Sequence, residues 1–259
     1  MKKLLGGKIL IIRRTYVAAL ALILAVVAIF YVIYHPAVVG QSASEHVMPI
    51  YRVEREEQVI ALSFNLSTTD DDVHTQRVLN ALNSANLSGT FFVTGEWVRA
   101  NRALAIEMAN DGHELMNLSD DHGLLRRLSS AHLQQNLAAC SLEIYEIMGT
   151  EPSLFRAPYG EYDPRLVEMA NAMGMQAVQW SVDSGDWRGL RADAIVEQVL
   201  DRAFPGAIVL LHSNLAETAL AMPRLIEELT SAGYEILPLS QLIYQDEYVI
   251  SLSGTQKVE

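Results

Sequence analysis

The sequence predicts an α/β protein, a distorted seven-stranded (β/α) barrel preceded by one N-terminal transmembrane helix. Short apolar runs alternate with amphipathic segments along residues 58–243, which predicts alternating strands and helices. Several of these runs are apolar throughout, as expected for parallel strands that are buried on both faces. A doubly wound sheet is the alternative architecture. No GxGxxG motif follows the first run, which disfavours a dinucleotide-binding version of it.

The N-terminal segment predicts a membrane anchor. Residues 15–34 carry no charge and are long enough to span a bilayer as a helix, and basic residues occur only on their N-terminal side. This asymmetry predicts residues 1–14 in the cytoplasm, 15–34 in the plasma membrane and the rest outside. A cleaved signal peptide is the alternative, because Ser42, Ala43 and Ser44 offer small residues for cleavage.

Composition limits the possible partners of the remaining chain. Half of all residues are apolar, which suits a globular domain and argues against disorder. The net charge is -12 although residues 1–34 contain only basic charged residues, so the rest is strongly acidic and a poor partner for nucleic acid. The single cysteine, Cys140, excludes an intrachain disulfide and is expected in the core.

The elements follow in order after a linker at residues 35–57. The apolar runs predict strands at residues 59–64, 90–93, 113–116, 154–155, 177–182, 207–211 and 234–237. Apolar residues at helical spacing predict helices at residues 72–86, 98–110, 130–149, 164–173, 192–203 and 218–232. Ser129 or Ser130 caps the third helix and Gly149 ends it, while Asp163 and Pro164 begin the fourth. Residues 244–259 are predicted to be a loose polar tail.

Polar residues follow most of the predicted strands. In a (β/α) barrel the loops at the carboxyl ends of the strands carry the function. A set of polar residues at one rim is hard to explain by packing and predicts a site there, with the loop at Arg156–Tyr159 as its centre. The alternative for that loop is a surface turn. The rim segments are Asn65, 94–97, 117–122, 156–159, 183–187 and 212–214.

Four ordered motifs resemble one family. They are Gly112-His113-Glu114 with Asn117 and His122, Arg156-Ala157-Pro158-Tyr159-Gly160, Asp183-Ser184-Gly185-Asp186-Trp187, and Leu210-Leu211-His212. Together they resemble the polysaccharide deacetylases with the NodB homology domain, carbohydrate esterase family 4, over about residues 58–243. The anchor, the linker segment 35–40 and the extension 160–163 look most like the sporulation-associated branch of spore-forming Firmicutes.

The resemblance implies a metal-dependent chemistry. The family uses a divalent metal, usually zinc, held by one Asp and two His, with a second Asp as base and a His as acid in N-deacetylation. By position, Arg156 resembles the residue that orients the base, Tyr159 the oxyanion contact, and Asp186 with His212 the pair that tunes the acid. The residues implied at the substrate are Trp180, Asp183, Trp187 and Leu210.

This sequence departs from the family pattern at the positions of the base and of two metal ligands. Asn65 takes the position of the base, and an amide cannot accept a proton near neutral pH. Leu66 and Leu118 take two metal-ligand positions, so His122 is the only ligand position retained. A catalytic zinc normally has three protein ligands, and loss of the base alone costs about 10²–10⁴ in rate. These replacements predict a degenerate deacetylase without a cofactor.

Zinc or another divalent metal is expected only if nearby residues replace the lost ligands. The candidates are Asp70, Asp71, Asp72 and His74, although the three aspartates more simply cap the following helix. Because Asn65 removes its natural partner, Arg156 is predicted to pair with another carboxylate, Asp186 or one of Asp70 to Asp72.

Three functions remain open. The favoured one is a non-catalytic protein of the spore or cell envelope that binds peptidoglycan-type glycan or a protein partner through the cleft that corresponds to the active site of the family. The second is an active metal-dependent hydrolase that removes N-acetyl groups from peptidoglycan or chitooligosaccharide amino sugars. The third is a structural module in a membrane complex whose cleft binds nothing.

Overall fold

The computed structural model describes residues 47–67 and 73–259. Contacts divide the chain into Met1–Glu45 and His46–Glu259, and the second unit is the folded domain. The predicted cytoplasmic segment, membrane anchor and most of the linker lie outside the described residues, as do Asp70, Asp71 and Asp72. Within the described part, no helix combines the length and the apolar character that crossing a membrane requires.

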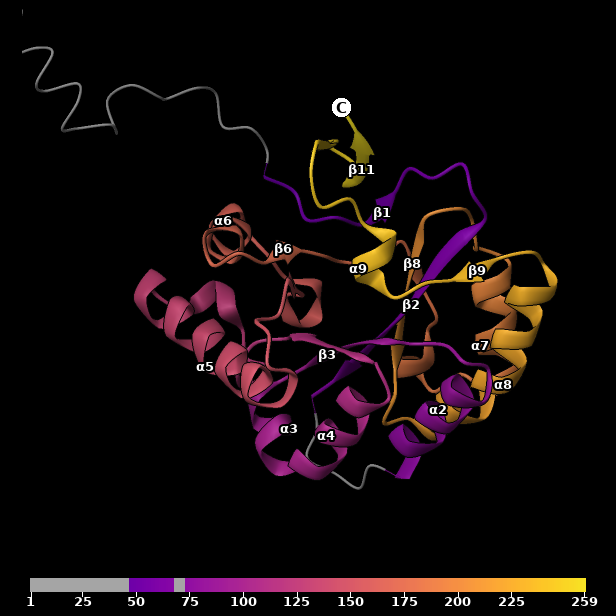
Figure 1. The fold of residues 1–259 in the computed structure, drawn as a ribbon. Coiled ribbons are helices and arrows are strands. Elements are labelled where there is room, and N and C mark those ends of the chain that lie inside the picture. Colours follow the sequence, from indigo (N-terminus) through magenta and orange to yellow (C-terminus); the bar gives the residue numbers. More distant parts are fainter. Residues whose placement is uncertain (1–46, 68–72) are drawn as a thin grey trace, which may run out of the picture. The chain divides into compact units, whose positions relative to one another are not determined.

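A parallel sheet centred on β2 (Val59–Leu66) forms the middle of the domain (Figure 1). β3 (Thr90–Val93), β4 (Glu114–Asn117) and β5 (Leu154–Phe155) follow on one side of β2, and β8 (Ala207–His212) pairs with the other side. All eight residues of β2 are buried, as the unbroken apolar run predicts for a strand covered on both faces. The register places Asn65 beside His212 at the carboxyl end of these strands.

The segment 176–183 connects the two sides of the sheet, because its first part pairs with β5 and its last part pairs with β8. The predicted strand 177–182 is in fact two short strands, β6 (Gln176–Ala177) beside β5 and β7 (Val182–Asp183) beside β8. Ser181 makes the change of partner, because its backbone N–H donates to Ile208 O and its hydroxyl accepts from Ile208 N. β9 (Glu235–Ile236) pairs with the start of β2. The barrel-like sheet is therefore distorted at strands only two residues long.

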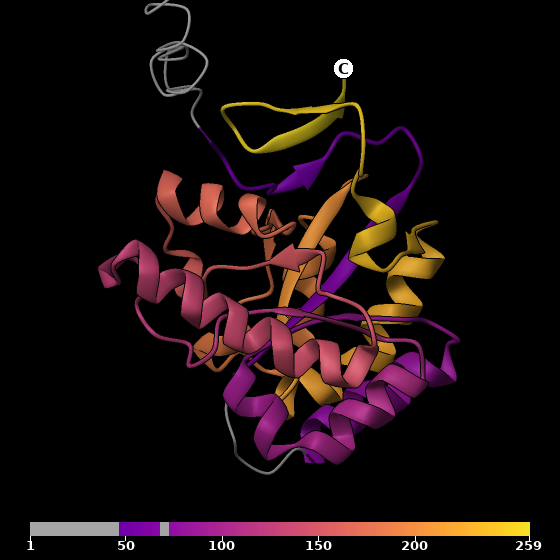
Figure 2. The same ribbon diagram turned by 60° about the vertical axis from the view of Figure 1, so that its left-hand side comes forward.

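Helices surround the sheet (Figures 1 and 2). One predicted helix, 98–110, is two, because Asn101 donates from its backbone and its side chain to Trp97 O and so ends α3. The predicted caps of the third and fourth helices are confirmed, since Ser129 accepts from His132 N and Asp163 from Leu166 N. The longer helices are α2 (Val73–Ser84), α3 (Gly95–Ala100), α4 (Arg102–Asn110), α5 (Ser130–Met148), α6 (Pro164–Ala172), α7 (Ala192–Leu200) and α8 (Ala216–Ser231).

Both predicted domain boundaries need correction. The end of the expected linker contributes β1 (Arg52–Val53), which lies antiparallel to β8, and Ile50 bridges to Val178. The expected loose tail forms β10 (Tyr248–Ile250) and β11 (Thr255–Val258), a hairpin that pairs with β1 (Figure 2). Gln256 is fully buried and exchanges hydrogen bonds with the backbone of Tyr244. The polar composition of this segment suggested a loose tail, but its polar side chains include one that is buried and paired.

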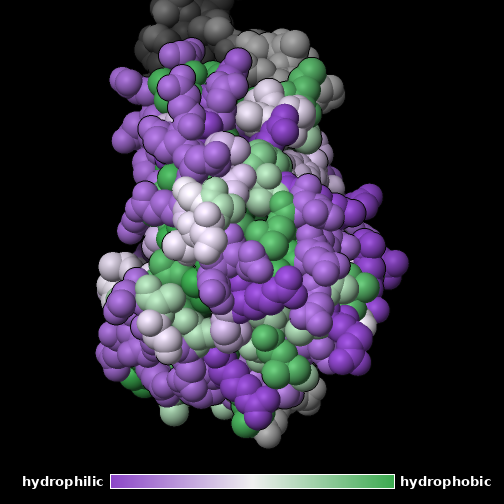
Figure 3. Space-filling model, turned by 90° about the vertical axis from the view of Figure 1, so that its right-hand side faces the viewer, coloured by the Kyte–Doolittle hydropathy of each residue, from purple (hydrophilic) through white to green (hydrophobic). Residues whose placement is uncertain are grey.

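The core is mostly aliphatic and lies between the sheet and the helices. Cys140 is fully buried there, as predicted, and burial raises the pKa of its thiol. On the face seen in Figure 3, hydrophilic side chains predominate and apolar ones form small separate patches. That face resembles an ordinary solvated surface.

Candidate functional site

A cavity of about 390 Å³ lies at the carboxyl ends of the strands. Residues far apart in sequence line it, which confirms the expectation that loops from different strands meet at one rim. The predicted rim segment 94–97 is not part of the lining. The lining residues are Asn65, His122, Tyr159, Trp180, Asp183, Trp187, Leu210 and His212.

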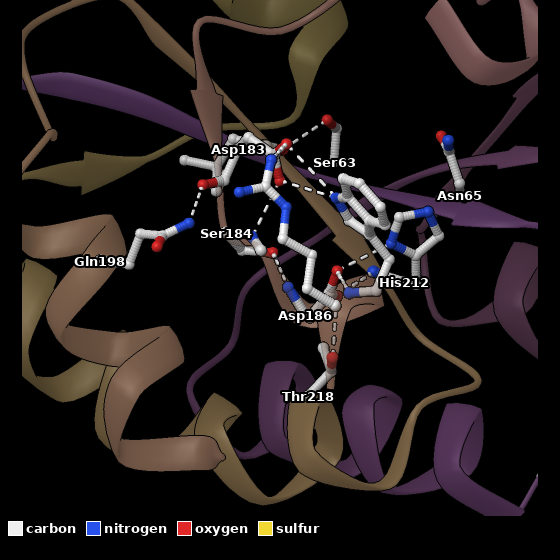
Figure 4. A network of polar contacts seen from close by, with 12 residues as sticks. Ser63, Asn65, Asp183, Ser184, Asp186, Gln198, His212 and Thr218 are labelled. Atoms are coloured by element: carbon white, nitrogen blue, oxygen red, sulfur yellow. Dashed lines mark hydrogen bonds and ion pairs between the residues drawn. The ribbon is translucent and has the colours of Figure 1, made fainter. Parts of the chain in front are cut away.

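Asp186 and His212 form a tight pair beside this cavity (Figure 4). Asp186 Oδ1 lies 2.8 Å from His212 Nδ1, while Oδ2 accepts from His212 N at 2.6 Å and from Thr218 Oγ1 at 2.8 Å. Burial alone would raise the pKa of the Asp186 carboxyl, but the hydrogen bonds from His212 and Thr218 outweigh it and leave this pKa lowered. The carboxylate therefore stays ionised and fixes the imidazole of His212, which lines the cavity, through Nδ1.

Arg156 is fully buried and pairs with neutral groups, not with a carboxylate. Nη1 donates to Asn65 Oδ1 at 3.0 Å, and Nη2 donates to Ser63 Oγ at 2.8 Å and to Gln179 O at 3.1 Å. The predicted pairing with a carboxylate is therefore wrong for the described residues. Asp186 is engaged with His212 instead. Burial lowers the pKa of Arg156 to about 9, so the guanidinium is still charged at neutral pH.

Aromatic rings complete the surroundings of this cation. The guanidinium carbon of Arg156 lies 3.9 Å from the centre of the Phe92 ring and 5.7 Å from that of Trp180. The negative faces of these rings offset part of the cost of burying the charge. Arg156 Nε has no hydrogen-bond partner among the described residues.

The positions that resemble metal ligands do not fit a metal ion. Leu66 and Leu118 are both 0% exposed and belong to the hydrophobic core, and neither offers a lone pair. Only His122 could donate to a metal at these positions. Residues 47–67 and 73–259 contain no group of three His, Cys, Asp or Glu side chains that could hold one. The described residues therefore lack the three protein ligands of a catalytic zinc.

Two of the loops at the cavity have an unusual backbone. Ser119 (φ 76°) and His122 (φ 53°) follow β4, and Tyr159 (φ 60°) lies in the turn Pro158–Gly160 after β5. Non-glycine residues rarely adopt positive φ, and such strain gathers at functional sites. The rings of His122 and Tyr159 are 4.6 Å apart at the cavity. Burial lowers the pKa of His122, and nearby His212 lowers it further.

The rim carries the predicted aromatic residues. Trp187 is 56% exposed, and its Nε1 donates to Asp183 Oδ1 at 3.2 Å. Leu210 is buried at the floor of the cavity, and Trp180 is half-buried at its wall. Gly160 has φ +70°, and a Cβ there would lie 3.0 Å from the Trp180 ring, so glycine allows this wall to approach the turn.

Three residues that hold the site were not identified from the sequence. Ser63 and Gln179 bind Arg156, and Thr218 binds Asp186. Ser63 interrupts an apolar strand, and this interruption was the available signal, because a buried polar side chain requires a partner. Gln179 binds Arg156 through its backbone carbonyl, a contact that no side-chain pattern indicates. Thr218 gave no comparable signal, since it lies in the first turn of an amphipathic helix.

Comparison with known proteins agrees with this geometry. The model of the polysaccharide deacetylase family matches residues 52–178. A peptidoglycan-N-acetylglucosamine deacetylase of Bacillus cereus is 30% identical over 198 residues, which cover 74% of this chain and 92% of that protein. The uncharacterized protein YlxY of Bacillus subtilis is 28% identical over 75% of this chain, which spans only 60% of the length of YlxY.

Solved structures include a close match in fold. BA3943 of Bacillus anthracis, described as a CE4 family pseudoenzyme, has a TM-score of 0.72 and 26% identity, covering 82% of this chain and 73% of that chain. A mutant of BA3943 described as having restored enzymatic activity matches with the same TM-score of 0.72 at 27% identity, covering 75% and 71% of the two chains.

Proposed function

Because the chain belongs to the polysaccharide deacetylase family, we propose that it is a membrane-anchored envelope protein that binds peptidoglycan-type glycan without deacetylating it. In this proposal residues 15–34 hold it in the plasma membrane, and the domain lies outside, at the spore or cell envelope. In this proposal the cleft still binds sugars but has lost the groups that cleave an amide.

One observation carries the proposal. Leu66 and Leu118 occupy two metal-ligand positions and are buried in the hydrophobic core, while Asn65 at the base position is hydrogen-bonded to Arg156. Without a metal-bound water and a base, an N-acetyl carbonyl has no activated nucleophile. The description of BA3943 as a pseudoenzyme supports an inactive member with this fold.

Retained features support sugar binding. Trp187 and Tyr159 are exposed at the rim, and aromatic faces beside a few fixed polar groups suit the apolar face of a sugar ring. His212 is oriented by Asp186, and Asp183 is held in place by Trp187 and Gly185.

Binding of an N-acetylglucosamine tetramer to the full-length protein tests the proposal by calorimetry. We expect binding, and we expect Trp187→Ala to weaken it about tenfold, the upper range for loss of an aromatic contact. Leu220→Ala is the matched control, because Leu220 is comparably exposed (59%) but lies on α8 and not at the cavity. No binding, or equal binding by both variants, would favour a passive structural module.

The alternative is an active metal-dependent deacetylase with relocated ligands. His74 Nδ1 is buried without a partner among the described residues, and the neighbouring aspartates lie outside them. One equivalent of tightly bound zinc in the purified protein, measured by elemental analysis, would favour this alternative.

A further inference from the structure

Arg156 fixes which atom of Asn65 faces the cleft. A guanidinium has donors and no acceptor, so the amide atom 3.0 Å from Nη1 must be Oδ1. Asn65 lines the cavity. Its Nδ2 makes no hydrogen bond to another described residue, and it is not one of the atoms that are completely buried without a partner, so it is accessible. The cleft therefore presents a hydrogen-bond donor at a position where an aspartate would present only acceptors.

The positive charge of Arg156 lies on the other side of the Asn65 amide, next to Oδ1. Every hydrogen bond that Arg156 donates ends on a neutral oxygen, and the guanidinium is completely buried. An anion that accepts from Asn65 Nδ2 would be separated from the guanidinium by one amide group. Charges interact strongly at such a separation when water is excluded.

The carboxylates near the cavity already have partners. Asp183 Oδ1 accepts from Gly185 N at 2.8 Å and from Trp187 Nε1, and Arg188 lies 3.6 Å from Oδ2. Asp186 is held by His212 and Thr218. Arg156 is thus the buried charge at this cavity that lacks an opposite charge among the described residues.

We propose that the Asn65 end of the cleft is a carboxylate-binding subsite, so that the cleft selects a sugar that carries an acidic group. The subsite itself rests on Asn65 and Arg156. The assignment of its carboxylate to a glycan rests on the proposed function. A carboxylate at Asn65 Nδ2 supplies both the missing acceptor and the missing negative charge.

Acetate and acetamide are matched probes for the subsite, since they have the same size and differ in charge. In NMR titrations of the full-length protein, we expect acetate to bind at least tenfold more tightly than acetamide. Asn65→Asp should weaken acetate at least tenfold because it gives Arg156 a carboxylate partner and turns an acceptor toward the cavity. Asn65→Leu, which is uncharged and lacks the donor, should weaken acetate to a similar extent.

Asn80→Asp is the control, because it makes the same substitution at an exposed position of α2 outside this cavity. It should leave the affinity for acetate unchanged. Equal affinity for acetate and acetamide, or equal effects of Asn65→Asp and Asn80→Asp, would overturn the subsite.

Two tetrasaccharides separate this proposal from the proposed function. One contains only N-acetylglucosamine, and in the other alternate sugars carry a lactyl carboxylate. We expect the acidic tetramer to bind at least tenfold more tightly than the neutral one, and Asn65→Asp to remove the difference. Equal binding of both would overturn the selectivity and leave glycan binding intact. Asn65-dependent acetate binding without binding of either tetramer would support the subsite and contradict the proposed function.

Discussion

At the scale of single residues, Arg156 is a buried cation held by neutral oxygens and an aromatic face. Its three hydrogen bonds and the Phe92 ring replace the water that the guanidinium loses. Removing one acceptor from a buried charge costs more than the net value of an average hydrogen bond, because the charge stays desolvated. The stability of the domain should therefore be sensitive to each acceptor.

Ser63→Ala tests this sensitivity. The hydroxyl accepts from Arg156 Nη2 and donates to Val209 O, and its loss should lower the free energy of unfolding by about 1–3 kcal/mol. Urea unfolding measures the change. Ser84→Ala is the control, since Ser84 is exposed on α2 and should change stability by less than about 0.5 kcal/mol. Equal effects of the two substitutions would contradict the role given to Ser63.

His113 should make the free energy of unfolding depend on pH. Its Nδ1 accepts from Gly89 N, its Nε2 is buried without a partner among the described residues, and burial lowers its pKa despite the nearby Asp111. Below the ordinary pKa of 6.5 the unfolded chain takes up a proton that the folded domain resists. The free energy of unfolding should therefore fall as the pH drops from 6.5 toward the lowered pKa.

His113→Asn isolates this contribution, because Asn Oδ1 can take the place of Nδ1 as acceptor without titrating. Urea unfolding between about pH 7 and pH 5 should show a shallower loss of stability in the variant than in the unsubstituted protein. His122, which is half-buried, also has a lowered pKa and contributes in the same direction, so some slope should remain. Identical slopes would show that His113 does not carry the dependence.

At the scale of elements, local signals predicted the structure where local contacts determine it. The helix from Ser130 to Met148 has its serine cap and terminal glycine in the sequence, and β2 is an unbroken apolar run. The hairpin at the C-terminus could not be predicted in this way. Its strand β11 is stabilised by β1, about 200 residues earlier, as the Arg52–Thr255 hydrogen bond illustrates.

The site also has a part that the sequence predicts and a part that it does not. The residues lining the cavity were predictable from motifs at strand ends, since parallel strands bring those ends to one rim. The partners of Arg156 were not, because side-chain hydrogen bonds in a barrel depend on which strands meet. Asn65 proved to be the partner of Arg156 as an amide, although the sequence suggested that its substitution would free the arginine.

The turn Pro158–Gly160 provides a test at this scale. Gly160→Ala would force a Cβ to within 3.0 Å of Trp180, whereas a Cβ at Gly174 would meet no atom within 4 Å. Both glycines have positive φ, so Gly174→Ala should cost about 1–2 kcal/mol from the backbone alone. Gly160→Ala should cost more in thermal unfolding and should alter the near-ultraviolet circular dichroism of the tryptophans. Equal costs would contradict a packing role for Gly160 against Trp180.

At the scale of the whole molecule, the chain combines a deacetylase-family fold with a cleft whose described residues lack three protein ligands for a catalytic zinc. Leu66 and Leu118 join the core clusters, so these positions now contribute burial where the family resemblance places metal ligands. The network of Asp186, His212 and Thr218 and the rim aromatics remain ordered around the cavity. Under the proposed function, recognition of the glycan has been kept while turnover has been lost.

Acetate release tests this account most directly. The full-length protein is incubated with an N-acetylglucosamine tetramer, with and without added zinc, and released acetate is measured alongside the metal content. We predict no acetate above the protein-free blank in either condition, and no stoichiometric zinc. Zinc-dependent release over many turnovers would contradict the account and assign this protein to the active deacetylases.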